Sequence, residues 1–341
     1  MRMSLKSQLN RLFQRRQKFS RAGGFTLIEL LVVVFIAGGI LSGLLYLVVE
    51  LLGVDQREAS RTETQREMQL AMDYIATELR EAVYVYNDCY LPQGSRSDPD
   101  GDPDNPDDDY CPGLINFLPD DLASAENIPV VAFWKQQPLP TVLKQRCDSA
   151  TPPADIPCRT ASSYALVVYS INTDPDGPWD GKARITRYAL TQFQSDGDPT
   201  PGYAPPEEGV NVRFDRWPVG IAGTDRRTGT PQDTSAVLVD FLDDDTGAAF
   251  SADDQTADLA RCPTGYTMTP SEEVLNSIDA PDIRSFYACV DQGQGNTNRD
   301  VILYIRGNAQ GRPGIAGEAS FLPTLETRVL SRGVLGRTPQ F

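Results

Sequence analysis

The sequence predicts an α+β fold, in which a long N-terminal helix packs its second half on an antiparallel β-sheet. Three observations predict it. Residues 25–52 are an apolar run with only two acids, and apolar side chains then continue at helical spacing as far as Tyr86. Beyond Asn87, short apolar runs alternate with turn-rich stretches, as in short strands. The chain therefore divides into a leader (1–24), an apolar half-helix (25–52), an amphipathic half-helix (53–87) and a β-rich body (88–341).

The composition argues against an enzyme. The 341 residues are 40% apolar, enough for a hydrophobic core, but they include no histidine. That excludes Ser–His and Cys–His nucleophile pairs and imidazole metal sites. A hydrolase could use two carboxylates such as Asp215 and Asp240, but acids are too abundant in this chain for one pair to stand out. We therefore expect no catalytic residues and no bound cofactor.

Charge is distributed unevenly along the chain. Residues 1–24 carry seven cations and no acid, whereas the remainder carries 24 cations and 47 acids, a net charge of −23. An acidic body repels phosphate backbones, which argues against nucleic-acid binding. The cationic leader should stay in the cytoplasm, so the body should lie on the other side of the membrane.

The apolar run is long enough to cross a membrane. As a helix, residues 25–52 measure about 42 Å, more than the roughly 30 Å of a hydrocarbon core. A cleaved secretory signal would be shorter, and no A-x-A-like site follows the run. A plain signal anchor fits the length but does not explain Glu29, because an unpaired acid inside a bilayer costs about 3 kcal/mol.

A cut between Gly24 and Phe25 explains Glu29. The cut creates an α-amine on Phe25 and makes Glu29 the fifth residue of the mature chain. A carboxylate in the first turns of a helix is stabilised by the helix dipole. It can also pair with an N-terminal ammonium, its own or that of a neighbouring subunit. The small residues before Phe25 would give a peptidase access to the bond.

The stretch GGFTLIE after a short basic leader resembles the type III signal of type IV pilins and pseudopilins. The resemblance implies that a prepilin peptidase cuts after Gly24 and methylates Phe25, and that Glu29 is the assembly carboxylate. It also implies a single-pass protein of the inner (cytoplasmic) membrane that joins other pilins and an assembly platform in a pilus or pseudopilus. Many major pilins have a proline in this helix and this chain has none; Gly38, Gly39 and Gly43 could weaken the helix instead or allow close packing.

Two later stretches, AMDYIATELREAVYVYN and IPVVAFWKQQPLP, resemble the hormogonium polysaccharide secretion pseudopilins of cyanobacteria and, more broadly, minor pilins of the W and J type. This resemblance implies a minor subunit of a machine that supports polysaccharide export and gliding. The alternative is an adhesin or glycan-binding module at the filament tip, anchored by the same helix. Its candidate loop aromatics are Trp179, Tyr203 and Trp217, each of which could instead anchor a loop on the sheet.

Period-two and apolar runs predict the strands of the body. Two of them, joined by the turn-rich NTDPDGPWDG, predict an antiparallel hairpin. Long loops are expected at about 88–128, 135–162, 195–235 and 243–298. The predicted strands are Val130–Trp134, Tyr164–Ile171, Ala183–Thr191, Ala236–Leu242, Asp300–Arg306 and one near Thr327–Leu330.

All six cysteines follow the predicted membrane span, which favours disulfides outside the cytoplasm. Fifteen pairings exist, and the simplest is sequential. Reduced buried thiols are the alternative, and a metal site is disfavoured because the chain has neither a C-x-x-C nor a histidine. Sequential pairing would close three of the long loops, each with one disulfide: Cys89–Cys111, Cys147–Cys158 and Cys262–Cys289.

The segment SDPDGDPDNPDDD, residues 97–109, has acids at every second position from Asp98 to Asp104, followed by Asp107–Asp109. Oxygen-rich loops of this kind suit Ca²⁺, which takes six to eight oxygen ligands. The spacing is not that of an EF-hand, and the prolines stiffen the loop. A solvated acidic loop is the alternative. The candidate calcium ligands are Asp98, Asp100, Asp102 and Asp104.

Overall fold

The structure is a computed structural model of the 341-residue chain. The chain forms two compact units, residues 1–55 and 56–341, which are described one at a time. The described residues are 24–87, 113–206, 214–220, 224–232, 234–244, 262–291, 300–315 and 321–331.

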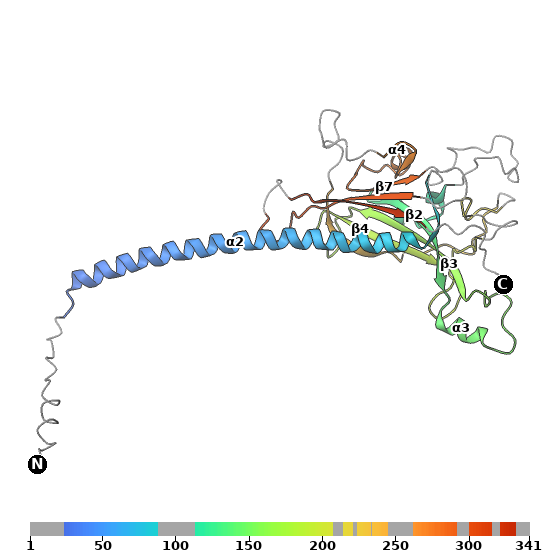
Figure 1. The fold of residues 1–341 in the computed structure, drawn as a ribbon, viewed down its shortest axis with the longest axis horizontal. Helices are drawn as coiled ribbons and strands as arrows, with labels where there is room; N and C mark the ends of the chain where they lie inside the picture. Colours follow the sequence, from blue (N-terminus) through green and yellow to red (C-terminus); the bar gives the residue numbers. More distant parts are fainter. Residues whose placement is uncertain are drawn as a thin grey trace, which may run out of the picture. The chain divides into compact units, whose positions relative to one another are not determined.

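Helix α2, Leu27–Arg80, has 54 residues (Figure 1). Its residues as far as Asp55 belong to the first unit, and the rest belong to the second. Every side chain from Gly24 to Leu52 is exposed. The most apolar 18-residue window of the helix has a mean hydropathy of 2.6. It is the one helix in the described parts of the chain that is long and apolar enough to cross a membrane. The first unit is therefore consistent with the membrane anchoring that the sequence predicts.

The second half of α2 supplies one side of the core of the second unit. Met68, Ile75 and Leu79 are fully buried, with Met72 at 5% exposure, and these residues share one helix face at the spacing predicted from the sequence. They pack against apolar side chains of both sheets in a single cluster. The helix is held in the body by this burial rather than by helix propensity.

The predicted continuation of α2 to Asn87 is wrong. The helix ends at Arg80, and Ala82–Val85 form strand β1, which pairs with the next strand of the sheet. The run Val83, Tyr84, Val85 and Tyr86 is β-branched or aromatic at every position, and such residues fit a pleated surface better than a helix. Val83 and Tyr86 continue the helical spacing of apolar residues only by coincidence.

The first sheet has five antiparallel strands in the order β1-β2-β3-β4-β5. The predicted hairpin is confirmed as β3–β4, with Ala165 opposite Thr191 and Asn172 opposite Arg184. Strands β2 and β3 pair over their whole lengths and are longer than predicted. The bounds of the four strands after β1 are Asn127–Pro138 for β2, Ser162–Asn172 for β3, Ala183–Thr191 for β4 and Ala236–Leu242 for β5.

A second antiparallel sheet, which the sequence did not separate from the first, has the order β6-β7-β8-β9. The predicted strands Asp300–Arg306 and Thr327–Leu330 belong to it, the latter beginning earlier, at Thr324. The expected loop over 243–298 contains two of its strands and a short helix. The bounds are Tyr266–Thr269 for β6, Phe286–Asp291 for β7, Asp300–Arg306 for β8, Thr324–Leu330 for β9 and Glu272–Ser277 for α4.

Three shorter helical segments lie in the connections. Two 3-10 helices, η1 (Leu114–Phe117) and η2 (Asp120–Leu122), precede β2. Helix α3, Thr141–Cys147, lies between β2 and β3. All three begin next to proline or glycine, which the sequence marks only as loop residues.

One buried carboxylate joins the end of α2 to the first sheet. Glu78 accepts two 2.8 Å hydrogen bonds from the Arg187 guanidinium, lies 2.7 Å from Lys135 Nζ and accepts a short hydrogen bond from the Tyr169 hydroxyl. Burial alone would raise the pKa of Glu78, but these donors outweigh it and lower the pKa to about 2. Strands β2, β3 and β4 are thus all tied to one helix side chain.

The segment 307–315, after β8, contacts α2 about five turns closer to the start of the helix than Glu78. Ser60 Oγ donates to Pro313 O at 2.7 Å, and Arg57 Nε donates to Gly314 O at 3.1 Å. A Cβ on Gly307 would stand 2.2 Å from Met68 Sδ, so this close approach requires glycine. Contacts between the body and α2 therefore extend back to Arg57, at the start of the second unit.

The face of the first sheet opposite α2 carries an aromatic cluster covered by loops. Trp134 Nε1 donates to Tyr86 OH at 3.0 Å, and Trp217 Nε1 donates to Ala204 O at 2.9 Å. Tyr203 and Trp217 are only 5% and 1% exposed. The sequence made both residues candidates for exposed, ligand-binding aromatics. In the structure they anchor loops instead, because their polar atoms form hydrogen bonds inside the cluster.

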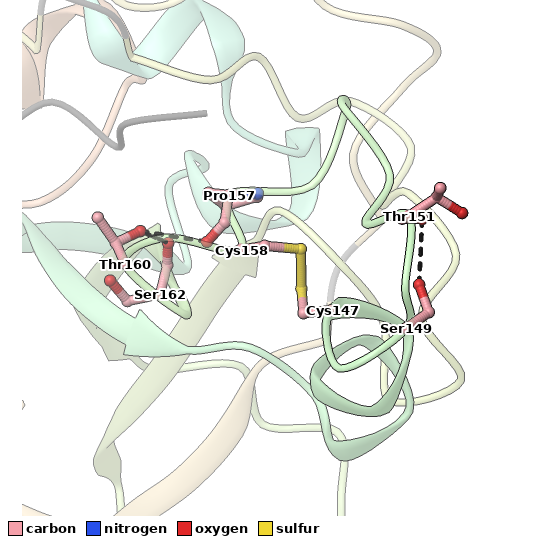
Figure 2. The surroundings of a disulfide bond; sticks show 7 residues. All are labelled: Cys147, Ser149, Thr151, Pro157, Cys158, Thr160 and Ser162. Atoms are coloured by element: carbon pink, nitrogen blue, oxygen red, sulfur yellow. Dashed lines mark hydrogen bonds between the residues drawn. A yellow bond between two sulfur atoms is a disulfide. The ribbon is translucent and has the colours of Figure 1, made fainter.

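Two disulfides are present among the described cysteines, Cys147–Cys158 and Cys262–Cys289, and none of these cysteines is free. Both are pairs of the sequential scheme. Cys147 ends α3, and its bond to Cys158 lies in the connection between β2 and β3 (Figure 2). Both cysteines pack against a small cluster that contains Leu143. Cys262 bonds to Cys289 in β7. The predicted pair Cys89–Cys111 lies outside the described residues.

We expect the two disulfides to protect their four cysteines from alkylation and to stabilise the folded body. The loops close over sequence separations of 11 and 27 residues, worth about 3 and 3.5 kcal/mol in the chain-entropy description. Alkylation of the denatured, unreduced protein followed by peptide mass spectrometry should find these four thiols unmodified and recover the two linked peptide pairs. Alkylated Cys147 or Cys262 would contradict the pairing and favour reduced buried thiols.

Candidate processing and assembly site

The bond predicted to be cut lies just outside a helix. Residues 24–26 are not helical, and α2 begins at Leu27. A Cβ built on Gly24 would meet no atom within 4 Å, and Phe25 is 79% exposed. A protease needs its substrate backbone free of helical hydrogen bonds, and this segment meets that requirement.

Thr26 is the N-cap of α2. Its side-chain oxygen accepts a hydrogen bond from Glu29 N at 3.3 Å, while its carbonyl accepts the first helical bond from Leu30 N at 3.2 Å. Threonine followed three residues later by glutamate is the capping-box pattern. The pattern is visible in the sequence as T-L-I-E, residues 26–29, and it is the local signal for this cap.

Glu29 therefore stands at the third helical position, inside the first turn. There its carboxylate lies in the first turn, at the positive end of the helix dipole. The side chain is exposed, and apolar residues surround it along the helix. The cap depends on the Glu29 backbone and not on its carboxylate, so the carboxylate remains available to bind a cation.

The apolar part of α2 presents small residues to its surroundings. A Cβ on Gly38, Gly39 or Gly43 would meet no other atom within 4 Å. A shallow groove runs along the helix past Leu31, Phe35 and Gly38. Small residues allow helix backbones to approach closely in membranes. The groove is therefore a surface on which a neighbouring helix can pack.

The acidic loop with Asp98, Asp100, Asp102 and Asp104 lies outside the described residues, so calcium binding stays a prediction. Within the described ranges, no group of three or more acidic or cysteine side chains is placed to hold a metal ion.

Two other candidates from the sequence can be located. Trp179, in the β3–β4 connection, is 43% exposed and is the one of the three candidate aromatics that reaches solvent. Asp240, on β5, accepts a hydrogen bond from Gly181 N at 3.0 Å, and a Cβ on Gly181 would stand 2.4 Å from its Oδ1. Asp240 therefore fixes the end of that connection against β5, which is a structural role.

Comparison with known proteins bears on the N-terminal site. Residues 19–45 match the family model described as the prokaryotic N-terminal methylation motif. The match contains the bond between Gly24 and Phe25, the Thr26 cap and Glu29. Together with the long apolar helix, it supports a type IV pilin-like protein. No curated protein and no solved structure gives a significant match.

A pilin-like chain with this motif is expected to be processed by a prepilin peptidase and to assemble with other pilins. Such proteins are structural subunits rather than enzymes. The match ends at residue 45. The long N-terminal helix and the antiparallel sheets of the structure agree with the predicted α+β fold.

Proposed function

We propose that this pilin-like protein is a minor pilin or pseudopilin, a structural subunit of a type IV pilus-like or secretion machine in the cytoplasmic membrane. The observation that carries the proposal is the arrangement at the start of α2. An exposed, non-helical glycine–phenylalanine bond precedes a capped helix whose first turn holds the acid Glu29.

The proposed cut and the docking step are chemically linked. Before the cut, the nitrogen of Phe25 belongs to a peptide bond and carries no charge. Cutting after Gly24 supplies an ammonium on Phe25, and methylation keeps its charge. In an assembly, the Glu29 carboxylate of one subunit binds the ammonium of a neighbour, because a charge pair shielded from water is far stronger than an exposed one.

The exposed apolar side chains in the first half of α2 must be shielded from water both before and after assembly. All of its large side chains are exposed within the first unit; Phe35 is 83% exposed and Leu51 is 70% exposed. Lipid covers them while the subunit is in the membrane, and neighbouring helices cover them in a filament. Gly38, Gly39 and Gly43 let those helices approach closely.

The more specific role, support of polysaccharide export and gliding, follows from the resemblance of two segments. In the fold these segments are adjacent: the first ends in β1, the second forms most of β2, and Val85 lies opposite Phe133. A resemblance in two segments that pair in one sheet supports a common body architecture. Exposed Trp179 keeps the alternative of a glycan-binding subunit open to test.

Co-purification tests the proposal. Tagged full-length protein, extracted from membranes, should bring down other subunits bearing the methylation motif and components of an assembly platform. Gly24→Val should stay uncut and lose these partners, because a β-branched residue replaces the small one before the bond. Its side chain meets open space, so the fold should be unaffected.

Gly53→Ala is the matched control, since Gly53 also faces open space but lies beyond the motif. It should be cut and should keep every partner. Recovery of the wild-type protein without any motif-bearing subunit would overturn the assembly role. Retention of partners by uncut Gly24→Val would separate assembly from processing and contradict the linkage proposed above.

A further inference from the structure

We propose that two copies of this chain bind head to tail through surfaces at opposite ends of strand β3. One surface is residues 141–160, the α3 segment, and the other is residues 173–182, the β3–β4 connection. The α3 segment of one copy binds the β3–β4 connection of the next. This inference goes beyond the proposed function and does not depend on cutting at Gly24.

The two surfaces lie at opposite ends of the body. Strand β3 separates them and has 11 residues, about 35 Å in extended form. The α3 segment lies near the end of α2, because Lys135, close to the end of β2, contacts Glu78, and Figure 1 shows α3 at that end of the body. A Cβ on Gly311 would stand 3.1 Å from Asp180 O. Gly311 belongs to the segment 307–315, which contacts α2 where the helix enters the body, so the β3–β4 connection lies toward the start of the helix.

A translation along the body keeps the two copies in the same direction. Shifting one copy by about the length of β3 brings its α3 segment and the β3–β4 connection of the other copy together. Both α2 helices then run the same way, as they must in one membrane or one filament. In a membrane the two copies stand at the same depth, so the contact forms when the leading copy has moved outward by that distance. The shift does not close on itself, so further copies can follow.

The α3 segment presents three exposed cations that form no ion pair within the described ranges. Its own acids, Asp148 and Asp155, leave it with a net charge of +1, from three cations and two acids, whereas residues 25–341 carry −23. Asp196 and Asp198 flank Gly197 beside α3 and also leave these cations without a described ion pair. The cations are therefore available to an acidic partner. They are Lys144, Arg146 and Arg159.

The α3 segment holds its cations in place. Its own small core contains Leu143 and Ile156. The Cys147–Cys158 disulfide has its Cα atoms 5.3 Å apart (Figure 2). Arg146 and Arg159 are the sequence neighbours of these two cysteines, so the disulfide keeps two of the three cations close together. A preformed surface of this kind loses little conformational entropy on binding.

The β3–β4 connection has the opposite charge and an exposed aromatic side chain. It contains three acids and one lysine, a net charge of −2, and the lysine is already paired with Asp244 at 3.3 Å. Trp179 is 43% exposed. Arg184, in β4, donates hydrogen bonds to Asn172 and to Asp174 O, which fixes the start of the connection. The three acids are Asp174, Asp176 and Asp180, of which the last two are exposed.

The chemistry of the two surfaces is complementary. Arginine binds carboxylates through parallel hydrogen bonds and also stacks on the face of tryptophan. Trp179 and the exposed acids offer both kinds of contact to Arg146 and Arg159. Val142, 38% exposed on α3, adds an apolar contact. Both surfaces belong to one chain, so the partner that fits is a second copy.

Cross-linking between two cysteine variants of the purified full-length protein in detergent tests the contact, because no bilayer fixes the depth of either copy there. Ala150→Cys marks the α3 segment and Pro175→Cys marks the β3–β4 connection, and both positions are exposed. A short thiol-specific cross-linker should join the two variants when they are mixed. In a head-to-tail contact each variant alone has one cysteine per contact, so we expect an about tenfold lower dimer yield from either variant by itself.

A charge reversal keeps the test sharp. Arg159→Glu in the Ala150→Cys copy places like charges at the contact and should lower the mixed yield about fivefold. Arg66→Glu is the matched control, because Arg66 is also exposed and without a described ion pair but lies on α2; it should leave the yield unchanged. Both changes are on the surface, and the unfolding midpoint checks that folding is intact. Equal dimer yields in the mixture and in the single variants, no dimer in the mixture, or equal effects of the two arginine changes would each overturn the proposal.

Discussion

Replacing Glu29 with alanine should leave insertion and cutting intact but abolish assembly. Insertion becomes easier when a charge is removed from a membrane helix. The cut should continue because the bond between Gly24 and Phe25 lies outside the helix, and the Thr26 cap uses only the backbone of residue 29. What is lost is the one carboxylate in the first turn that can bind a neighbour's ammonium.

The measurement is a comparison of cut protein in membranes with protein recovered in sheared filaments or in the purified complex. Glu50→Ala is the matched control, because Glu50 is the other acid of the apolar run but lies at its far end. It should assemble normally. Full assembly of Glu29→Ala would refute docking through the carboxylate, and equal loss in both variants would point to a general helix defect.

Glu78→Gln should destabilise the body by about 3–5 kcal/mol, the usual cost of removing one partner from a buried charge cluster. The change leaves the Arg187 guanidinium without its carboxylate and leaves the Lys135 ammonium with only the exposed Glu81, although the side chains of Arg187 and Lys135 are only 25% and 15% exposed. Denaturant unfolding followed by tryptophan fluorescence measures it, since Trp134 and Trp217 are buried in the body.

The matched control is Glu81→Gln. Glu81 also contacts Lys135, at 3.5 Å, but its side chain is 57% exposed, and exposed pairs contribute about 1 kcal/mol or less. A small effect of Glu81→Gln beside a large one of Glu78→Gln would locate the stabilisation in the buried cluster. Equal small effects would show that Glu78 does not anchor α2.

The Glu78 cluster also makes the stability of the body depend on pH in the acid range. Because the pKa of Glu78 is lowered from its ordinary 4.5 to about 2, its contribution to stability is complete above pH 4.5 and is lost as the pH falls toward 2. Wild type should therefore lose stability over this window more steeply than Glu78→Gln. Parallel pH profiles of the two proteins would contradict the lowered pKa.

Strands whose apolar residues follow a clear pattern could be predicted from the sequence. Ala183–Thr191, Ala236–Leu242 and Asp300–Arg306 were predicted with the bounds that the structure has. Strand β7 was missed because FYACVD is a short run followed by the turn-rich DQGQGN. Strand β1 was read as helix because spacing alone cannot distinguish a helix from the first residues of the strand that follows it.

The proposed processing site can be recognised in the sequence because it is local. Gly24, Phe25 and Glu29 lie within six consecutive residues, and their spacing carries the chemistry without help from the fold. The Glu78 cluster could not be predicted, because its partners come from β2, β3 and β4 and meet only when the sheet packs on α2. Likewise, nothing in the sequence distinguished buried Tyr203 and Trp217 from exposed Trp179.

Mass spectrometry of the N-terminal peptide from the membrane fraction tests the central claim most directly. Tryptic or chymotryptic peptides should begin at Phe25 and carry one additional methyl group on the α-amine. Residues 1–24 should be absent from the mature protein. An intact Met1 terminus, or a terminus beyond Leu52, would contradict processing at this site and with it the assembly of the protein as a pilin-like subunit.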